Sequence, residues 1–300
     1  MIVRRVQAVG GGSLSISLPK SWVVRNGIRK GDNLIMEERA DGSLLIFADR
    51  RRKERETELD FSGDRSLETI LSRYLLGFDR IKIRFPNGLS IEQRKKVMKF
   101  ISRLPGMELE DESSNILVFR CTMDPASMKP REILLKMHEM AYRMLDDAIK
   151  AANTGDKNLM DLIKERDDVL DRIYFTVVRA ARLALIDAGV IARLGVNPVE
   201  LMDLRICAML EEGIGDIAVE LAYMNVDPEA IAVMKKLSDL KEMVSRAIET
   251  GSEEAAYESK MVGLKLLEEV REVGGNIAGI LERVIRAYID ISDLCIAWSY

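Results

Sequence analysis

From Pro130 onward the chain consists almost entirely of amphipathic helical segments, and this feature constrains the fold more than any other. Apolar side chains recur every three or four residues, which is the spacing of one helix face. Short breaks rich in Gly, Asn, Asp and Pro separate the segments. The expected helices span residues 130–152, 157–188, 198–225, 228–250, 252–273 and 276–299. Helices of this number and length predict two three-helix bundles in tandem.

An internal repeat supports this division into two bundles. The segment Met144–Ile149 resembles the segment Met243–Ile248, and each is followed shortly by a Thr-Gly pair. The two pairs are Thr154-Gly155 and Thr250-Gly251. Repetition of a supersecondary unit at a fixed offset is typical of tandem helical modules. We therefore interpret residues 126–300 as one helical body made of two related halves.

Residues 1–48 differ in pattern and predict a small β module. The expected strands are Ile2–Val6, Ser13–Leu18, Asn33–Arg39 and Ser43–Phe47, with turns at Gly10–Gly12 and at Asp41-Gly42. A short helix should span Lys20–Asn26 and end at Gly27. So short a module cannot bury enough apolar surface by itself. We therefore expect a homodimer or a higher oligomer that assembles through these residues.

Residues 49–125 predict a small α+β domain that follows a charged linker, Arg50–Lys53. The expected strands and helices are Glu56–Phe61, Ser66–Leu76, Arg80–Phe85, Ser90–Arg103, Met107–Glu110 and Ile116–Arg120. No catalytic nucleophile and no phosphate-binding loop is recognisable in this stretch. It is interpreted as a spacer or an interaction module. The fold class predicted for the chain is therefore mainly α, with an α+β N-terminal part.

The composition excludes several kinds of site. His138 is the one histidine, so a catalytic triad could use no other histidine, and the composition argues against metal sites built on several histidines. The three cysteines, Cys121, Cys207 and Cys295, are far apart and fit neither a disulfide framework nor a Cys-based zinc site, which predicts a reducing cytoplasm. No apolar run reaches the roughly 18 residues of a transmembrane helix, and the N-terminal segment lacks the apolar stretch of a signal peptide. We therefore expect no insertion into a membrane.

Charge is distributed unevenly along the chain, whose formal net charge is −4. Residues 1–55 hold 12 Lys and Arg against 6 Asp and Glu, whereas residues 126–300 hold 22 against 31. A basic head on an acidic body indicates that an anionic partner, such as duplex DNA, binds at one end only. An ordinary basic surface without any nucleic-acid partner is the alternative interpretation.

The order of elements in residues 1–48 resembles the AbrB/SpoVT swapped-hairpin DNA-binding domain. The matching motifs are Leu18-Pro19-Lys20, Asn26-Gly27-Ile28 and Lys30-Gly31-Asp32. The resemblance implies dimerisation through interleaved hairpins and DNA binding by basic side chains on one face. The matching candidates are Arg4, Arg5, Lys20, Arg25, Arg29 and Lys30. Many family members carry an Arg directly after the glycine turn, whereas this chain has Gly11-Gly12-Ser13, so a module that only dimerises remains an alternative.

Two acidic pairs on successive predicted helices form a candidate metal site. They are Asp167 with Asp171 and Glu212 with Asp216, each spaced four residues apart and so placed on one helix face. Like charges at this spacing disfavour each other, and a bound cation would relieve the repulsion. Carboxylates without His or thiolate partners suit hard cations such as Mg, Mn or Fe(III). The alternative is a solvated acidic face, which is common in a chain with 49 Asp and Glu.

The sequence around the second pair resembles a known family signature. The segment Glu212–Ala218 is similar to the Glu-Arg-Ile-Gly-Asp-His-Ala signature of PhoU proteins, except at Gly213 and Ile217. The segment Glu165–Tyr174 is similar to the Asp-rich signature on the preceding helix of that family. The resemblance implies a cytoplasmic regulator of phosphate uptake with a multinuclear metal cluster, here of iron, magnesium or manganese. It also implies partners such as the ATPase subunit of a phosphate transporter and a sensor kinase.

The repeat predicts that only the first bundle holds metal. Aligning the two Thr-Gly pairs places Gly263 and Leu267 at the positions of Asp167 and Asp171. Aligning Glu282 with Glu212 places Arg286 at the position of Asp216. Further ligand candidates in the first bundle, ranked lower, are Glu165, Asp168 and Glu220.

These observations favour a DNA-binding transcriptional regulator of phosphate uptake with a metal-binding helical sensor domain, and not an enzyme. One alternative is a PhoU-type adaptor that acts on a phosphate transporter without binding DNA. Another is an enzyme that uses a carboxylate-bound metal for redox or hydrolytic chemistry. The sequence contains no G-x-x-x-x-G-K-[ST] loop, which argues against an ATPase.

Overall fold

The computed structural model describes residues 2–38, 42–48, 54–224, 228–273 and 275–299 of the 300-residue chain. The chain divides into two compact units, residues 1–53 and residues 54–300, and each unit is described by itself. The predicted linker at Arg50–Lys53 and residue Asp41 of the predicted hairpin turn lie outside the described residues.

The first unit, which we call the head, begins with a short antiparallel pair. Strand β1 (Gln7–Val9) pairs with β2 (Ser13–Ser15) across a turn in which Gly11 and Gly12 have φ values of 80° and 85°. Such positive values favour glycine because it lacks a Cβ. The predicted strand at Ile2–Val6 was wrong, because these residues are irregular and pairing begins only at Gln7. The paired residues are the three immediately before the glycine turn and the three immediately after it.

The rest of the head follows the predicted order. Helix α1 (Lys20–Arg25) starts after Pro19, and Gly27 follows it with φ at 60°. Strand β3 (Leu34–Glu38) pairs antiparallel with β4 (Leu44–Ala48). None of the described residues between 2 and 48 is buried. One copy of the head therefore has no hydrophobic core among its described residues, although it is rich in apolar side chains.

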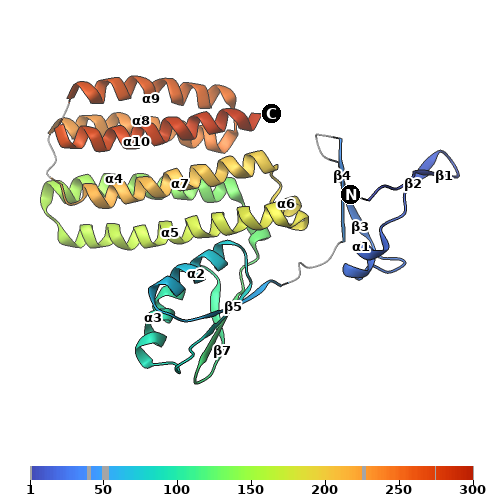
Figure 1. The fold of residues 1–300 in the computed structure, drawn as a ribbon. Coiled ribbons are helices and arrows are strands. Elements are labelled where there is room, and N and C mark those ends of the chain that lie inside the picture. Colours follow the sequence, from blue (N-terminus) through green and yellow to red (C-terminus); the bar gives the residue numbers. More distant parts are fainter. Residues whose placement is uncertain (1, 39–41, 49–53, 225–227, 274, 300) are drawn as a thin grey trace. The chain divides into compact units, whose positions relative to one another are not determined.

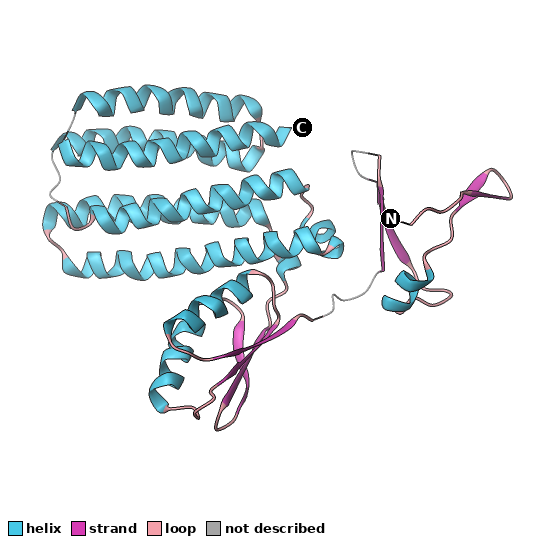
Figure 2. Cartoon of the chain, viewed as in Figure 1, coloured by secondary structure: helices cyan, strands magenta, loops and turns pink. Residues whose placement is uncertain are grey.

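The second unit begins with an α+β domain. Its elements are β5 (Glu56–Asp60), α2 (Asp64–Leu75), β6 (Arg80–Arg84), α3 (Ile91–Ile101), β7 (Met107–Glu112) and β8 (Ile116–Cys121). The sheet order is β5-β6-β8-β7, with β5 and β6 parallel and the other neighbours antiparallel. Figure 2 shows α2 and α3 beside the strands. The predicted elements of this domain are confirmed to within a few residues at their ends.

Helices form the remainder of the second unit. Their bounds are Pro125–Ser127 for the 3-10 helix η1, then Pro130–Thr154 (α4), Lys157–Ile186 (α5), Ala188–Leu194 (α6), Pro198–Leu221 (α7), Pro228–Thr250 (α8), Glu253–Val273 (α9), Gly275–Ile296 (α10) and Ala297–Ser299 (η2). The short helix α6 was not predicted. It starts where the Asp187 side chain accepts a hydrogen bond from the Gly189 backbone N–H, and it ends at Gly195 with φ at 68°.

The long helices pack as two groups of three, as predicted. Helices α4, α5 and α7 pack together, and α8, α9 and α10 form the other group (Figure 1). The groups also touch each other, since α7 packs on α10 and α4 packs on α8. One continuous cluster of buried apolar side chains runs through all six helices. No described helix combines the length and the apolar character needed to cross a membrane.

A buried arginine fastens the α+β domain to helix α5. The Arg179 side chain is fully buried, and its Nη1 donates to the carbonyl oxygens of Tyr74 and Phe78 at 2.6 and 2.9 Å. Its Nη2 lies 3.2 Å from Asp79 Oδ1. Beside it, a Cβ on Gly77 would overlap the side chain of Leu183. The turn after α2 therefore rests directly on the bundle.

Candidate metal centre and DNA-binding face

Helices α5 and α7 carry the four carboxylates of the predicted metal site, which we call the acidic cluster: Asp167, Asp171, Glu212 and Asp216. The two helices pack against each other, so pairs that lie more than 40 residues apart in sequence come together in space. Glu212 shares a side-chain hydrogen bond with Asp171, and the charges of all three aspartates raise its pKa. The structure thus places the two predicted pairs next to each other.

A glycine allows this close approach of the two helices. A Cβ built on Gly215 would lie 2.5 Å from Leu170 Cδ2 and 3.3 Å from Asp167 Oδ1. Any larger residue at this position would push α7 away from α5 or displace both side chains. Glycine inside a helix costs about 1 kcal/mol relative to alanine. Here the space between α5 and α7 at the acidic cluster accounts for its presence.

Three carboxylates of the acidic cluster, those of Asp167, Asp171 and Glu212, lie in an environment that opposes full ionisation. Burial, together with the neighbouring carboxylates, raises the pKa of Glu212 to about 7 and the pKa of Asp167 to about 6. Burial also raises the pKa of Asp171, and the Arg103 guanidinium opposes that rise. Raised carboxyl pKa values indicate that the local negative charge is incompletely compensated. A bound cation would supply the missing compensation.

The donor chemistry of the cluster fits a hard metal ion, but the arrangement is not a preformed metal site. Asp167 Oδ1 is buried without a hydrogen-bond partner, which leaves an oxygen free to coordinate. Yet among the described residues, no group of three or more His, Cys, Asp or Glu side chains is arranged so that it could hold an ion. Instead, Arg103 Nη2 lies 2.8 Å from Asp171 Oδ2 and 3.7 Å from Asp168 Oδ1.

The ligand candidates that ranked lower are Glu165, Asp168 and Glu220. Glu165 and Asp168 are exposed. Glu220 pairs with Arg283 of α10 at 2.7 Å.

At the corresponding place in the second group of helices, guanidinium groups neutralise the remaining carboxylate. Glu282 pairs with Arg271 at 3.0 Å and with Arg286 at 2.7 Å. These ion pairs lower the pKa of Glu282, in contrast to the raised pKa of Glu212. The guanidinium groups of Arg271 and Arg286 thus supply positive charge at this position, and the absence of metal there remains a prediction.

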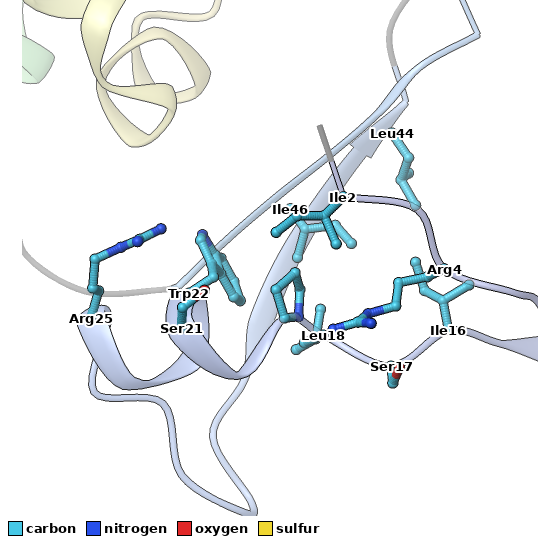
Figure 3. Close-up of a pocket in the computed structure, with 11 residues that line it drawn as sticks. Ile2, Arg4, Ile16, Ser17, Leu18, Ser21, Trp22, Arg25, Leu44 and Ile46 are labelled. Atoms are coloured by element: carbon cyan, nitrogen blue, oxygen red, sulfur yellow. The ribbon is translucent and has the colours of Figure 1, made fainter.

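The six basic residues predicted to bind DNA are all exposed on the head. Arg4 and Arg25 line one open pocket of about 520 Å³, together with Ile16, Leu18 and Trp22 (Figure 3). Of the remaining four, Arg5 follows Arg4 in sequence, Lys20 begins α1, and Arg29 and Lys30 lie in the turn after α1. Two of the six candidate cations therefore lie at a pocket that also has apolar side chains in its lining.

Sequence reasoning missed a buried polar pair in the helical body. His138 and Glu211 are both fully buried, with Nδ1 and Oε1 2.7 Å apart. His138 Nε2 lies 3.0 Å from the Lys241 carbonyl oxygen. Glu211 belongs to the stripe of α7 that also buries Cys207 and Ala208. A carboxylate inside an apolar stripe is the signal that could have revealed the pair.

Comparison with known families agrees with this architecture. Residues 134–224 match the family model for the PhoU domain. This segment is therefore similar to a PhoU domain. Its matched range runs from α4 through α7 and so includes all four residues of the acidic cluster. Residues 7–57 match the model described as antidote-toxin recognition MazE, bacterial antitoxin, which corresponds to the predicted AbrB-like head. Searches of curated proteins and of solved structures find no match.

Proposed function

We propose that this protein regulates phosphate uptake as a dimer that binds duplex DNA through its head and a metal ion through the acidic cluster of its PhoU domain. The observation that carries the proposal is the PhoU match over residues 134–224, the segment that holds the acidic cluster. The MazE match at residues 7–57 supports the DNA-binding part, because heads of this class commonly dimerise and bind DNA. The metal is proposed to be iron, magnesium or manganese.

In this proposal the acidic cluster binds the ion, and a hard cation would neutralise carboxylates that are costly to ionise when metal is absent. A cation would stabilise two of these residues most. Asp167 Oδ1 has no hydrogen-bond partner, and the pKa of Glu212 is raised to about 7. Gly215 keeps α7 close enough to α5 for both helices to contribute.

Loss of the acidic cluster is expected to remove bound metal. The double variant Asp167→Ala/Asp171→Ala takes away the two carboxylates of α5, so elemental analysis of the purified protein should show its metal content falling close to zero. The matched control is Glu254→Ala/Glu258→Ala, an exposed acidic pair with the same spacing on α9. Equal metal content in the wild type and the Asp167/Asp171 variant would contradict the assignment.

Removal of the head is expected to abolish or weaken self-association. None of the described residues of the head is buried in one copy, and apolar side chains such as Val3, Leu14 and Met36 are at least 65% exposed. A second copy that covers this apolar surface would supply the missing core. Light scattering should give at least a dimer mass for the full chain and a lower mass for a chain that starts at Glu54. An unchanged assembly state would refute a dimer held by the head.

DNA binding is expected to depend steeply on salt. Each phosphate that a basic side chain neutralises adds about −0.9 to the slope of log K against log salt, so about three phosphates per protomer give a slope of about −5 for a dimer. The variant Arg4→Ala/Arg5→Ala should flatten the slope by about 0.9 for every phosphate that is no longer neutralised, as measured by fluorescence anisotropy with duplex DNA. The control Lys95→Ala/Lys99→Ala removes two exposed cations of α3, outside the head. If the full chain binds no duplex even at low salt, DNA binding is wrong.

A PhoU-type adaptor that does not bind DNA is the second candidate. The observation that favours it is the tip of the β1–β2 hairpin, where Gly11-Gly12-Ser13 stands in place of the Arg found in many AbrB-like heads. In that case the head only dimerises, and the protein acts on the ATPase subunit of a phosphate transporter. The anisotropy measurement with duplex DNA distinguishes the two candidates.

A further inference from the structure

Arg103 connects the α+β domain to the acidic cluster. It lies in the turn between α3 and β7, and its guanidinium reaches Asp171 of α5 with Nη2 and Oδ2 2.8 Å apart. The same nitrogen lies 3.7 Å from Asp168 Oδ1. The Arg103 side chain is 48% exposed, so it can leave this position without disrupting a core.

The backbone around Arg103, in contrast, is held firmly by its own domain. Leu104 is buried, and the Tyr74 hydroxyl donates a hydrogen bond to the Pro105 carbonyl oxygen at 2.9 Å. Gly106 has φ at 75°, and a Cβ at this position would lie 2.6 Å from Met123 Cβ. The turn therefore presents the Arg103 side chain to α5 from a fixed base. Only the guanidinium is free to exchange partners.

Arg103 compensates the charge of the acidic cluster only in part. Its positive charge lowers the pKa values of Asp171 and Asp167, yet burial and the surrounding carboxylates still raise both. Asp167 Oδ1 keeps no hydrogen-bond partner. A guanidinium carries one positive charge and binds as a flat fork, whereas a divalent cation carries two charges and can be approached by oxygens from several directions. A metal ion and Arg103 would therefore compete for the same Asp171 oxygen.

We propose that Arg103 is a tethered counter-ion that competes with the metal for Asp171, and that it therefore sets the metal affinity of the acidic cluster. This inference rests on the proposed metal site. When metal binds, Arg103 leaves Asp171, and the α+β domain loses that tie to α5. Metal occupancy of the PhoU domain is thereby transmitted to the α3–β7 turn. When metal leaves, the guanidinium returns and restores the ion pair.

Titration of the metal-free full chain with Mn²⁺, followed by the electron paramagnetic resonance signal of the free ion, tests the competition. The variant Arg103→Gln removes the competing charge and should bind Mn²⁺ roughly three- to tenfold more tightly than the wild type, because a partly exposed ion pair is of modest strength. Arg94→Gln is the matched control, since Arg94 pairs with Glu112 inside the α+β domain at 2.7 Å. Its affinity should equal that of the wild type.

The outcomes separate this inference from the metal proposal. Equal or weaker Mn²⁺ binding by Arg103→Gln, with binding by the wild type intact, overturns the role of Arg103 and leaves the metal site standing. If the wild type binds no more Mn²⁺ than Asp167→Ala/Asp171→Ala does, the metal site fails and the role of Arg103 fails with it.

A second measurement uses the wild-type protein and does not depend on how a variant folds. The guanidinium protons of Arg103, followed by ¹⁵N NMR, should exchange with water faster when Mg²⁺ is added, because the ion pair with Asp171 no longer protects them. The guanidinium protons of Arg94, which pairs with Glu112 inside the α+β domain, should be insensitive to Mg²⁺. An equal metal-induced change at both arginines, or none at Arg103, would contradict the tether.

Discussion

Replacing His138 by alanine is expected to lower the free energy of unfolding of the helical body by about 3–5 kcal/mol, the usual cost of breaking a buried ion pair by removing one partner. His138 of α4 is hydrogen-bonded to Glu211 of α7 and to the Lys241 carbonyl of α8, and its ring lies 5.1 Å from the ring of Tyr288 on α10. The variant leaves the Glu211 carboxylate buried without its cation. It also removes the side chain that joins the two groups of three helices at this point.

The protonation of this pair follows from its partners. A carbonyl oxygen can only accept a hydrogen bond, so His138 Nε2 carries a proton and donates a hydrogen bond to the Lys241 carbonyl oxygen. Burial by itself lowers the pKa of His138, but the Glu211 carboxylate and the hydrogen bonds outweigh it and raise the pKa above the ordinary 6.5. The proton that titrates is therefore the one on Nδ1, which faces the Glu211 carboxylate, and the folded protein retains it at pH values where the unfolded chain releases it. The stabilisation is complete below about pH 6.5 and is lost as the pH rises through the folded pKa.

Urea unfolding followed by helical circular dichroism at several pH values checks this prediction. The matched control is Glu211→Gln, which keeps the shape and can still hydrogen-bond a neutral imidazole, so it should cost less than His138→Ala and should remove the loss of stability at high pH. A double replacement by apolar residues of similar size, His138→Leu/Glu211→Met, should recover much of the stability. A cost below about 1 kcal/mol for His138→Ala, the size of an ordinary hydrogen bond, would contradict the assignment.

Replacing Arg179 by alanine is expected to have a similar cost, about 3–5 kcal/mol. The variant leaves the carbonyl oxygens of Tyr74 and Phe78 without the guanidinium and removes the cation beside Asp79. It also leaves a cavity, because Arg179 is among the largest fully buried side chains. The main consequence should be a looser attachment of the α+β domain to α5.

Hydrogen exchange of residues 73–80 reports this attachment, and thermal unfolding reports the stability. Arg179→Lys should recover little, since an ammonium group cannot donate to three acceptors through a flat fork. Arg172→Ala is the control, because Arg172 is an exposed residue of the same helix. If Arg179→Ala melts like Arg172→Ala, the buried arginine does not fasten the domain.

Much of the helical fold could be predicted because long amphipathic helices repeat apolar residues every three or four positions, and this period is visible in the sequence. The two groups of three helices follow from six such segments and from the Gly and Pro breaks between them. The exceptions were short elements. Helix α6 depends on a local cap at Asp187, and the irregular stretch Ile2–Val6 has the composition of a strand but does not join the β1–β2 ladder. Short segments carry too little periodic signal to decide between such outcomes.

The acidic cluster could be predicted for a similar reason, since pairs four residues apart must share a helix face. Arg103 could not, because it lies 68 residues from Asp171 and reaches it only through the packing of two domains. His138 and Glu211, 73 residues apart, are paired by the same kind of packing. Spacing along one helix is visible in a sequence, whereas partners contributed by separate elements become visible only in the fold.

The lack of buried side chains among the described residues of the head bears on how the protein responds to its own abundance. In the proposed dimer the head gains an interior only from a second copy and folds by a bimolecular reaction, so its folded fraction follows mass action. Dilution then lowers the folded fraction of the head, whereas the helical body keeps its own core at any concentration. In dilute protein the folded pairs of heads increase with the square of the chain concentration. Under the proposed function, the number of molecules in a cell, as well as any ligand, would then determine how much of the protein can bind DNA.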